Sequence, residues 1–370
     1  MVVGIDARAA AEVPAGRGRV VRELLLALDA LKPPHRFRLF CREPWNEVSL
    51  GAQFEWVPIG LPDPLWHARA AVEANRRCDV FFSTNSYLTA WMLRVPCAVL
   101  VHDLIAFLPH APAHKGAARI ERATIRPAIR RAESLVCNSL STERDLIRFF
   151  PRAAGHTAVI PFAAEKRFHR ERSPAELTSV TERFGVQVDG FVFATGTLEP
   201  RKNLLRLIRA HAGLAPARRD HHPLLIVGPR GWEEKEVVDA AAGSEHVKLA
   251  GFVSDDDLAA LYSACAVFAY PSLYEGFGLP VLEAMAAGAA VVTADNSSLP
   301  EVGGDAVVYV QAEDESSITL ALENLLTDPG KRAALGARAR QRARSFSWER
   351  VARSMIGELE RVASAANTRR

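Results

Sequence analysis

The sequence predicts an α/β protein made of two doubly wound domains. Strand and helix signals alternate over residues 1–165 and again over residues 189–345, the order that produces parallel sheets covered by helices. Between the two sets, residues 166–188 are largely polar and lack a strand signal, so we assign them to a linker region. The chain has 370 residues, which is enough for two cores of ordinary size.

Composition and charge narrow the class of protein. Hydrophobic residues make up 49% of the chain, and the net charge of +3 is too small to indicate a nucleic-acid partner. Five scattered cysteines without metal-like spacing fit reduced thiols. The first residues read as a strand and not as an export signal, and no apolar run is long enough to cross a bilayer. We therefore expect a cytoplasmic protein whose contact with the inner face of a membrane is at most peripheral.

A glycine-bearing loop follows the first predicted strand, residues 2–6. It contains Gly16, Arg17 and Gly18 and leads into a helix, as at the start of a doubly wound fold. The glycines would let the backbone approach a ligand, and Arg17 could face an anion. An ordinary exposed loop explains these residues equally well.

His102 and Asp103 directly follow a buried strand predicted over residues 97–101, and Asn138 closes the next predicted strand. Sites in α/β proteins take their residues from the carboxyl ends of parallel strands. We therefore favour a functional role for His102 over a structural one.

Four arginines lie on one face of the helix predicted over residues 115–132. They are Arg119, Arg122, Arg126 and Arg130. Such a stripe could contact anionic lipid head groups or an acceptor phosphate. A solvated helix face, which would also carry Glu121, is at least as good an explanation.

The second half begins with a strand that ends at Gly196 and a basic loop. Arg201 and Lys202 lie where the next helix starts, with Asn203 as the expected N-cap. Cations beside the free N–H groups of a helix start would hold a diphosphate and stabilise the charge of a leaving nucleotide. An ordinary basic loop is the alternative.

A second loop carries two carboxylates eight residues apart, Glu275 and Glu283. Gly276 and Gly278 lie between them and Pro280 marks the helix start, where proline is tolerated. Two acids that flank an anion-binding helix end suit a ligand with hydroxyls at both ends and phosphates in the middle, such as a nucleotide-sugar. Surface acids on a plain strand–turn–helix are the alternative.

The run Ser254-Asp255-Asp256-Asp257 could suggest a metal site. A serine N-cap with acids in the first turn complements the helix dipole without any metal, so we predict a cap and no metal ligands.

Together these patterns resemble the family 4 retaining glycosyltransferases of the GT-B fold, whose EX7E motif matches Glu275 and Glu283. The resemblance covers most of the chain and is weakest in the first hundred residues. It implies two Rossmann-like domains that face a central cleft, with the acceptor side in residues 1–165 and the nucleotide-sugar side in residues 189–345. It also implies that a helix in residues 346–370 packs back on the first domain.

The resemblance further implies roles for single residues. Lys202 matches the lysine that holds the donor's diphosphate, but Thr197 stands where the family has arginine, which leaves Arg201 as the available substitute. Glu275, Lys202 and His102 would be catalytic, His102 by contact with the transferred sugar, and Gly16, Arg17 and Gly18 would form an acceptor or interface loop. The donor-binding residues would be Gly196, Arg201, Lys202, Val253, Glu275, Gly276, Phe277, Gly278, Leu279 and Glu283.

The implied activity is transfer of a hexose, with retention, from a nucleotide-diphosphate sugar to a glycan or lipid-linked acceptor in cell-surface polysaccharide biosynthesis. No metal or other cofactor is expected. GDP-mannose is the favoured donor, and a UDP-sugar is the alternative. A nucleotide-sugar-binding protein without transfer activity, a sugar phosphorylase or epimerase on the same fold, and a scaffold protein are the rival hypotheses.

Overall fold

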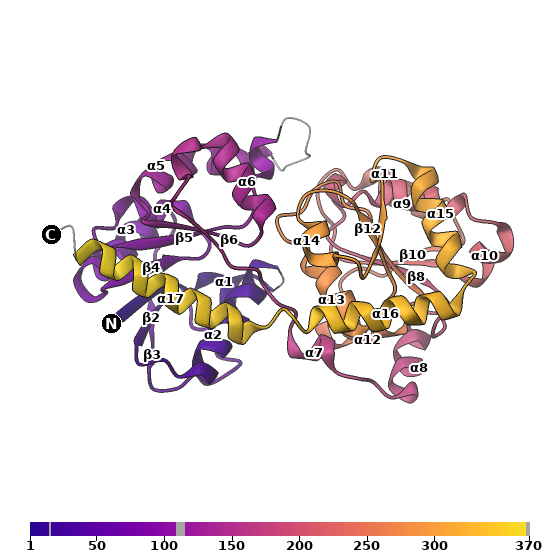
Figure 1. The fold of residues 1–370 in the computed structure, drawn as a ribbon, viewed down its shortest axis with the longest axis horizontal. Helices are drawn as coiled ribbons and strands as arrows, with labels where there is room; N and C mark the ends of the chain where they lie inside the picture. The colour runs from indigo at the N-terminus through magenta and orange to yellow at the C-terminus, as the bar shows by residue number, and fades with distance from the viewer. Residues whose placement is uncertain (15, 109–114, 368–370) are drawn as a thin grey trace. The chain divides into compact units, whose positions relative to one another are not determined.

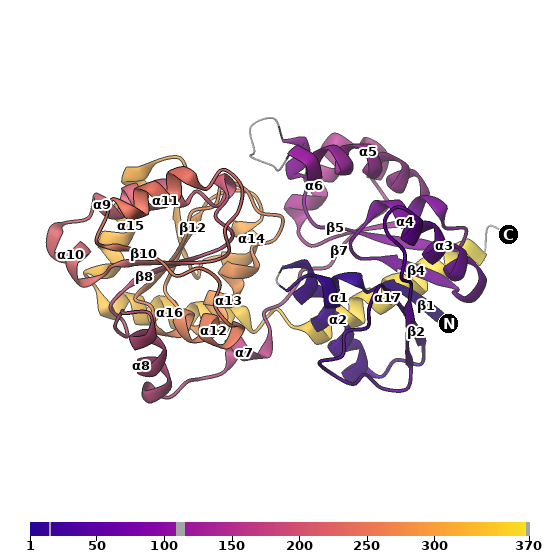
Figure 2. The ribbon, with the colours of Figure 1, turned by 180° about the vertical axis from the view of Figure 1, so that it is seen from behind.

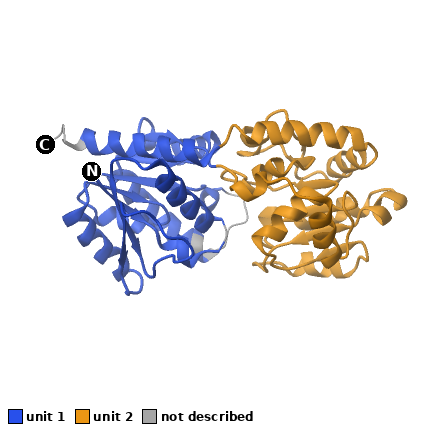
Figure 3. Ribbon diagram, turned by 90° about the horizontal axis from the view of Figure 1, so that it is seen from below, with its two compact units in different colours: residues 1–108, 115–162, 347–370 blue, residues 109–114, 163–346 orange. Residues whose placement is uncertain are grey.

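The computed structural model describes residues 1–14, 16–108 and 115–367, and the chain forms two compact units. Unit 1 contains Met1–Leu108, Lys115–Phe162 and the chain from Ser347 onward, whereas the described part of unit 2 is Ala163–Phe346 (Figure 3). Each unit has its own sheet and its own hydrophobic core.

Unit 1 is built on a parallel sheet that has seven strands in the described residues, in the order β3-β2-β1-β4-β5-β6-β7. The strands are β1 (Val2–Asp6), β2 (Arg36–Cys41), β3 (Phe54–Pro58), β4 (Val80–Ser83), β5 (Cys97–Val101), β6 (Ser134–Cys137) and β7 (Thr157–Val159). Strands β4, β5 and β6 are buried at every position because helices cover both faces of the sheet. The strand order reverses between β1 and β4, and doubly wound folds bind ligands at such a reversal.

Helices α3, α4 and α5 lie on one side of this sheet, and α2 and α17 lie on the other (Figures 1 and 2). The helical segments of unit 1 are α1 (Arg8–Glu12), α2 (Arg17–Leu31), α3 (Leu65–Arg77), α4 (Tyr87–Met92), η1 (Ile105–Phe107), α5 (Lys115–Arg131), α6 (Leu140–Phe149), η2 (Pro151–Ala153) and α17 (Trp348–Asn367). Helix α17 thus places the end of the described chain in unit 1. Its Trp348 ring stacks on Phe162 with 6.0 Å between the ring centroids, and its Glu358 accepts a hydrogen bond from Ser134 of β6.

Unit 2 contains a parallel sheet of six strands in the described residues, in the order β10-β9-β8-β11-β12-β13. The strands are β8 (Val192–Thr195), β9 (Leu224–Val227), β10 (Val247–Leu249), β11 (Val267–Tyr270), β12 (Val291–Ala294) and β13 (Val308–Val310). The helical segments are α7 (Lys166–His169), α8 (Pro174–Arg183), η3 (Pro200–Lys202), α9 (Leu204–Ala212), α10 (Pro216–His221), α11 (Lys235–Ala242), α12 (Asp255–Ala264), α13 (Leu279–Ala287), α14 (Leu299–Gly303), α15 (Glu315–Leu326) and α16 (Pro329–Ala343). In this unit the order reverses between β8 and β11.

Residues 166–188, predicted as a linker, belong to unit 2 and form α7 and α8. Phe168 is fully buried, and its ring meets Tyr262 edge-on with 5.8 Å between the centroids. Arg183 forms an ion pair with Asp257 of α12. The assignment to a linker was wrong because a single buried residue such as Phe168, placed among polar residues, produces no hydrophobic periodicity in the sequence.

The aspartate run at the start of α12 is a helix cap, as predicted. The Ser254 hydroxyl accepts a hydrogen bond from the backbone N–H of Asp257 at 3.1 Å. Asp256 and Asp257 form ion pairs with Arg167 and Arg183. All five cysteines are buried free thiols, and none of the described helices has the length and hydropathy needed to span a bilayer.

Gly336 and Gly357 offer a matched test of helix packing. A Cβ at Gly336 in α16 would lie 2.2 Å from the Gly288 carbonyl oxygen, whereas a Cβ at Gly357 in α17 meets nothing within 4 Å. Gly336→Ala should therefore lower the free energy of unfolding by about 1–3 kcal/mol, because α16 must move away from α13. Gly357→Ala should raise it by about 0.5–1 kcal/mol, because alanine favours helix. Equal melting temperatures for the two variants in calorimetry would contradict this packing.

Candidate functional site

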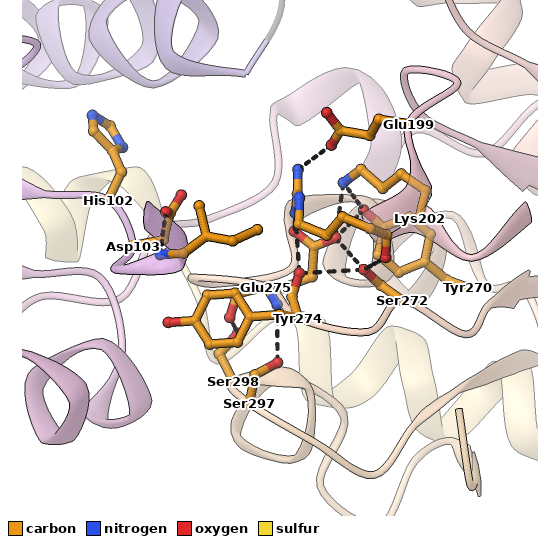
Figure 4. A network of polar contacts seen from close by, with 12 residues as sticks. His102, Asp103, Glu199, Lys202, Tyr270, Ser272, Tyr274, Glu275, Ser297 and Ser298 are labelled. Atoms are coloured by element: carbon orange, nitrogen blue, oxygen red, sulfur yellow. Dashed lines mark hydrogen bonds and ion pairs between the residues drawn. The ribbon is translucent and has the colours of Figure 1, made fainter. Parts of the chain in front are cut away.

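A network of buried charges surrounds Glu275, which is 7% exposed in the loop between β11 and α13. Its Oε1 lies 2.8 Å from the Lys202 ammonium, and its Oε2 lies 2.7 Å from the Arg201 guanidinium. The hydroxyls of Tyr270 and Ser272 each donate to Oε1 at 2.8 Å (Figure 4). One carboxylate therefore receives two cations and two hydroxyl donors.

The sheet topology explains why these residues meet. Lys202 follows β8 and Glu275 follows β11, so the two loops leave the sheet at its strand-order reversal. Asn203 fastens the loops together: its φ is +60°, and its side-chain amide donates to the carbonyls of Pro271 at 2.9 Å and Ala312 at 2.7 Å. Asn203 therefore occupies the N-cap position without capping α9 through its side chain, contrary to the expected cap.

The second acid of the motif lies one turn into α13. Helix α13 starts at Leu279, after Gly278 with φ +99°, a conformation that side chains other than glycine rarely adopt. Glu283 is buried and accepts a hydrogen bond from the Tyr262 hydroxyl at 3.2 Å. The Ser298 hydroxyl donates to the Glu275 carbonyl at 2.9 Å, so the loop before α13 is also fixed by the loop after β12.

Electrostatics favour an ionised Glu275. Burial by itself would raise the pKa of this carboxyl, but Arg201, Lys202 and the hydrogen bonds from Lys202 and Tyr270 lower the pKa to about 2. Burial lowers the pKa of Lys202, as does the neighbouring Arg201, while Glu275 acts in the opposite direction. Burial and Glu275 raise the pKa of Tyr270, so its hydroxyl stays protonated and can donate.

Other residues predicted for the same site lie in the surrounding loops of unit 2. Gly196 has φ +136°, and a Cβ there would lie 3.3 Å from Cε of Lys202, so this glycine makes room for the lysine stem. Gly276 and Phe277 are buried, and the Phe277 ring lies 6.2 Å from that of Phe346. Leu279 and Val253 are half-buried.

The remaining predicted residues belong to unit 1. His102 Nε2 lies 2.9 Å from the Thr84 carbonyl oxygen, and burial lowers the pKa of His102 to about 4. Gly16 precedes α2 with φ +54°, and Arg17 is exposed. A Cβ at Gly18 would lie 1.7 Å from the Val13 carbonyl oxygen, so close packing of the chain already requires glycine there.

The four arginines of α5 are all exposed. Two of them have partners within unit 1: Arg122 Nε donates to the Ala106 carbonyl at 2.6 Å, and the Arg126 guanidinium lies 6.0 Å from the centre of the Phe150 ring. The stripe therefore exists, but half of it also packs against its own domain.

Sequence reasoning missed Tyr270 and Ser272. Tyr270 ends an apolar strand and Ser272 follows a proline. The pattern therefore indicated an ordinary strand residue and an ordinary loop residue. The available signal was their position at the carboxyl end of β11, next to the strand-order reversal.

The pKa of Glu275 predicts a pH-dependent stability. Because the pKa falls from 4.5 to about 2 on folding, the ionised carboxylate stabilises the fold above pH of about 4.5, and this contribution disappears as the pH falls through about 2. Glu275→Gln should therefore lower the free energy of unfolding by about 3 kcal/mol at neutral pH, with a gap to wild type that narrows toward pH 3. Urea unfolding at several pH values measures this gap. A difference in unfolding free energy that stays constant with pH would contradict the lowered pKa of Glu275. So would a difference that narrows in the same way for the exposed control Glu182→Gln.

Comparison with known proteins identifies the family. Residues 14–163 match the family model described as Glycosyltransferase Family 4, and residues 185–342 match the one described as Glycosyl transferases group 1. The chain is 32% identical over 273 residues to O-antigen chain mannosyltransferase B of Escherichia coli, an alignment that covers 73% of this chain and 71% of that protein.

Solved structures share the fold over nearly the whole chain. Sucrose-phosphate synthase from Thermosynechococcus elongatus is 20% identical with a TM-score of 0.79, covering 99% of this chain and 100% of that one. HepE of Anabaena in complex with UDP-glucose is 20% identical with a TM-score of 0.75, covering 97% of this chain and 99% of that one. The chain therefore belongs to the family 4 glycosyltransferases and has the GT-B fold.

Proposed function

We propose that the chain transfers mannose, with retention, from a nucleoside-diphosphate donor to a glycan or lipid-linked acceptor in polysaccharide biosynthesis. The observation that supports it most is the contact of Lys202 and Arg201 with Glu275 at the strand-order reversal of unit 2. Cations and a carboxylate at one point suit a ligand that joins a diphosphate to a sugar.

Arg201 and Lys202 would hold the diphosphate. In the structure both cations pair with Glu275, and Arg201 also pairs with Glu199. A diphosphate carries more negative charge than one carboxylate, so we infer that both cations turn to the phosphates when the donor binds. Glu275 then has lone pairs available for hydroxyls of the hexose.

The start of α13 would contribute backbone donors. Gly278 lets the chain turn sharply into this helix, and the amides of Phe277 and Gly278 would meet the sugar or the phosphate. Glu283, oriented by the Tyr262 hydroxyl, would accept hydrogen bonds from the ribose. In this assignment each acid of the motif binds one end of the donor.

Retention without a metal ion is the mechanism that we propose. The acceptor hydroxyl would attack the anomeric carbon from the face on which the nucleoside diphosphate leaves, and the leaving phosphate would take the hydroxyl proton. Arg201 and Lys202 would stabilise the charge that develops on the leaving phosphate, the task that a divalent cation performs in other transferases. The chain's contribution is then positioning and electrostatics.

The choice of sugar and acceptor follows the relatives. A curated relative is named as an O-antigen chain mannosyltransferase, which favours mannose and a growing glycan. The fold neighbour HepE was solved with UDP-glucose, which keeps a uridine donor as the second candidate. We propose GDP-mannose as the donor and no further cofactor.

A thermal-shift panel with GDP-mannose and UDP-glucose tests the diphosphate assignment. Lys202→Ala should weaken donor binding about 10- to 100-fold, because it removes a charge-assisted bond. The comparison uses the donor-induced shift of each variant relative to its own unliganded melting temperature, since the substitution also removes a partner of Glu275. Lys331→Ala, at an exposed site on α16, is the matched control and should bind donor like wild type.

Equal donor-induced shifts in Lys202→Ala and wild type would contradict the assignment. Transfer is tested separately by the release of nucleoside diphosphate on addition of an acceptor glycan. A protein that binds the donor without transferring its sugar would bind the donor tightly and release no nucleoside diphosphate. Its Glu275→Ala variant would bind the donor almost as tightly as wild type.

A further inference from the structure

The loop that carries Glu275 is held by the segment that follows β12. The Glu275 backbone N–H donates to the Ser297 hydroxyl at 3.0 Å, and the Glu275 carbonyl accepts from the Ser298 hydroxyl at 2.9 Å (Figure 4). The Asn296 amide donates to the Ser272 carbonyl at 3.1 Å. Ser298 is fully buried, so water does not compete for its bond. The segment therefore fixes the backbone on both sides of the Glu275 side chain.

Helix α14 continues from this segment and is too short to be stable by itself. It has five residues, Leu299–Gly303, and a helix of this length does not form in isolation in water. Its last carbonyl groups also lack partners within the helix. The position of α14 must therefore come from side chains of other elements. Whatever fixes α14 also fixes Ser298, which directly precedes it.

Arg342 of α16 supplies those partners. Its Nε donates to the Val302 carbonyl at 2.7 Å, and its Nη2 donates to the Glu301 carbonyl at 2.7 Å. A guanidinium at the carbonyl end of a helix forms charge-assisted bonds and complements the helix dipole. Gly304 makes room for it, because a Cβ there would lie 2.4 Å from Cζ of Arg342. The Tyr309 hydroxyl adds a second hold by donating to the Gly304 carbonyl at 2.8 Å.

Helix α16 is a firm support for α14 because it is attached to the other side of the donor loop as well. Arg340 Nη2 donates to the Ala287 carbonyl at the end of α13 at 2.9 Å. Just after α16, the Phe346 ring lies 6.2 Å from the ring of Phe277 in the donor loop. Arg342 thus joins α14 to a helix that already packs on α13, the helix that carries Glu283.

We propose that Arg342 is a positioning residue for the sugar of the donor. By holding α14 it holds Ser297 and Ser298, and through them the orientation of Glu275. The inference rests on the proposed function, in which Glu275 binds hydroxyls of the hexose. The diphosphate and ribose contacts of that function come from η3 and α13 instead. Loss of Arg342 should therefore impair recognition of the sugar more than recognition of the nucleotide.

Arg342→Ala should weaken binding of GDP-mannose about fivefold more than binding of GDP, the effect of one hydrogen bond to the sugar. Isothermal titration calorimetry measures both ligands on each variant, and UDP-glucose with UDP replaces this pair if wild type binds uridine donors instead. A general loss of stability would weaken both ligands equally. Arg342→Lys keeps the charge and one donor, so it should recover part of the selectivity.

Ser298→Ala interrupts the same connection at its other end and should cause the same selective loss. This variant decides the test if Arg342→Ala does not fold. In the unliganded protein, hydrogen exchange of the backbone amides in residues 272–278 should be faster in Arg342→Ala than in wild type. In a Glu275→Gln background, Arg342→Ala should cause no further loss of GDP-mannose affinity, because Arg342 acts through Glu275.

The matched control is Arg338→Ala, at an exposed position on the same helix, which should bind both ligands like wild type. Equal weakening of GDP-mannose and GDP would overturn the proposal, as would unchanged hydrogen exchange in residues 272–278. With donor binding intact in wild type, either result leaves the proposed function in place. If GDP-mannose and UDP-glucose both fail to stabilise wild type, the proposed function fails and this inference falls with it.

Discussion

The buried contact of Lys202 and Arg201 with Glu275 is the interaction on which the rest of the unit 2 site depends. Removing these three charges from water is costly, and the cost is offset only where their remaining hydrogen-bonding capacity is used. Tyr270 and Ser272 supply that compensation by donating to the same carboxylate oxygen. Because the network joins the loops after β8 and β11, it fixes the positions of Lys202, Arg201 and Glu275 relative to one another.

The alternation of strands and helices made the fold predictable, since fully buried parallel strands read as continuous apolar runs. Where the regular pattern lapsed, the prediction was wrong. Residues 166–188 were assigned to a linker, yet they belong to unit 2 through Phe168 and the ion pair of Arg183 with Asp257. Such contacts depend on elements far along the chain, so no local pattern in the sequence could reveal them.

The site was predictable to the extent that its residues stand directly after strands. Lys202 and Glu275 carry a charge in a glycine-bearing loop, which made them candidates, and the structure brings them into contact. The sequence pattern did not single out Tyr270, because a tyrosine at the end of an apolar strand is a common residue of a hydrophobic core. Asn203 was assigned to a cap, but its positive φ turns the amide toward Pro271 and Ala312.

The two units share one topology but present different chemistry at the carboxyl edges of their sheets. In unit 2 the loop after β8 brings cations, and the hydrogen bonds around Glu275 are satisfied within the protein. In unit 1 the residues after β4 and β6 bring amides whose oxygens lack partners among the described residues. Cations that already pair with a carboxylate can pair with a phosphate in its place. Unpaired acceptor atoms instead suit a ligand that supplies hydrogen-bond donors.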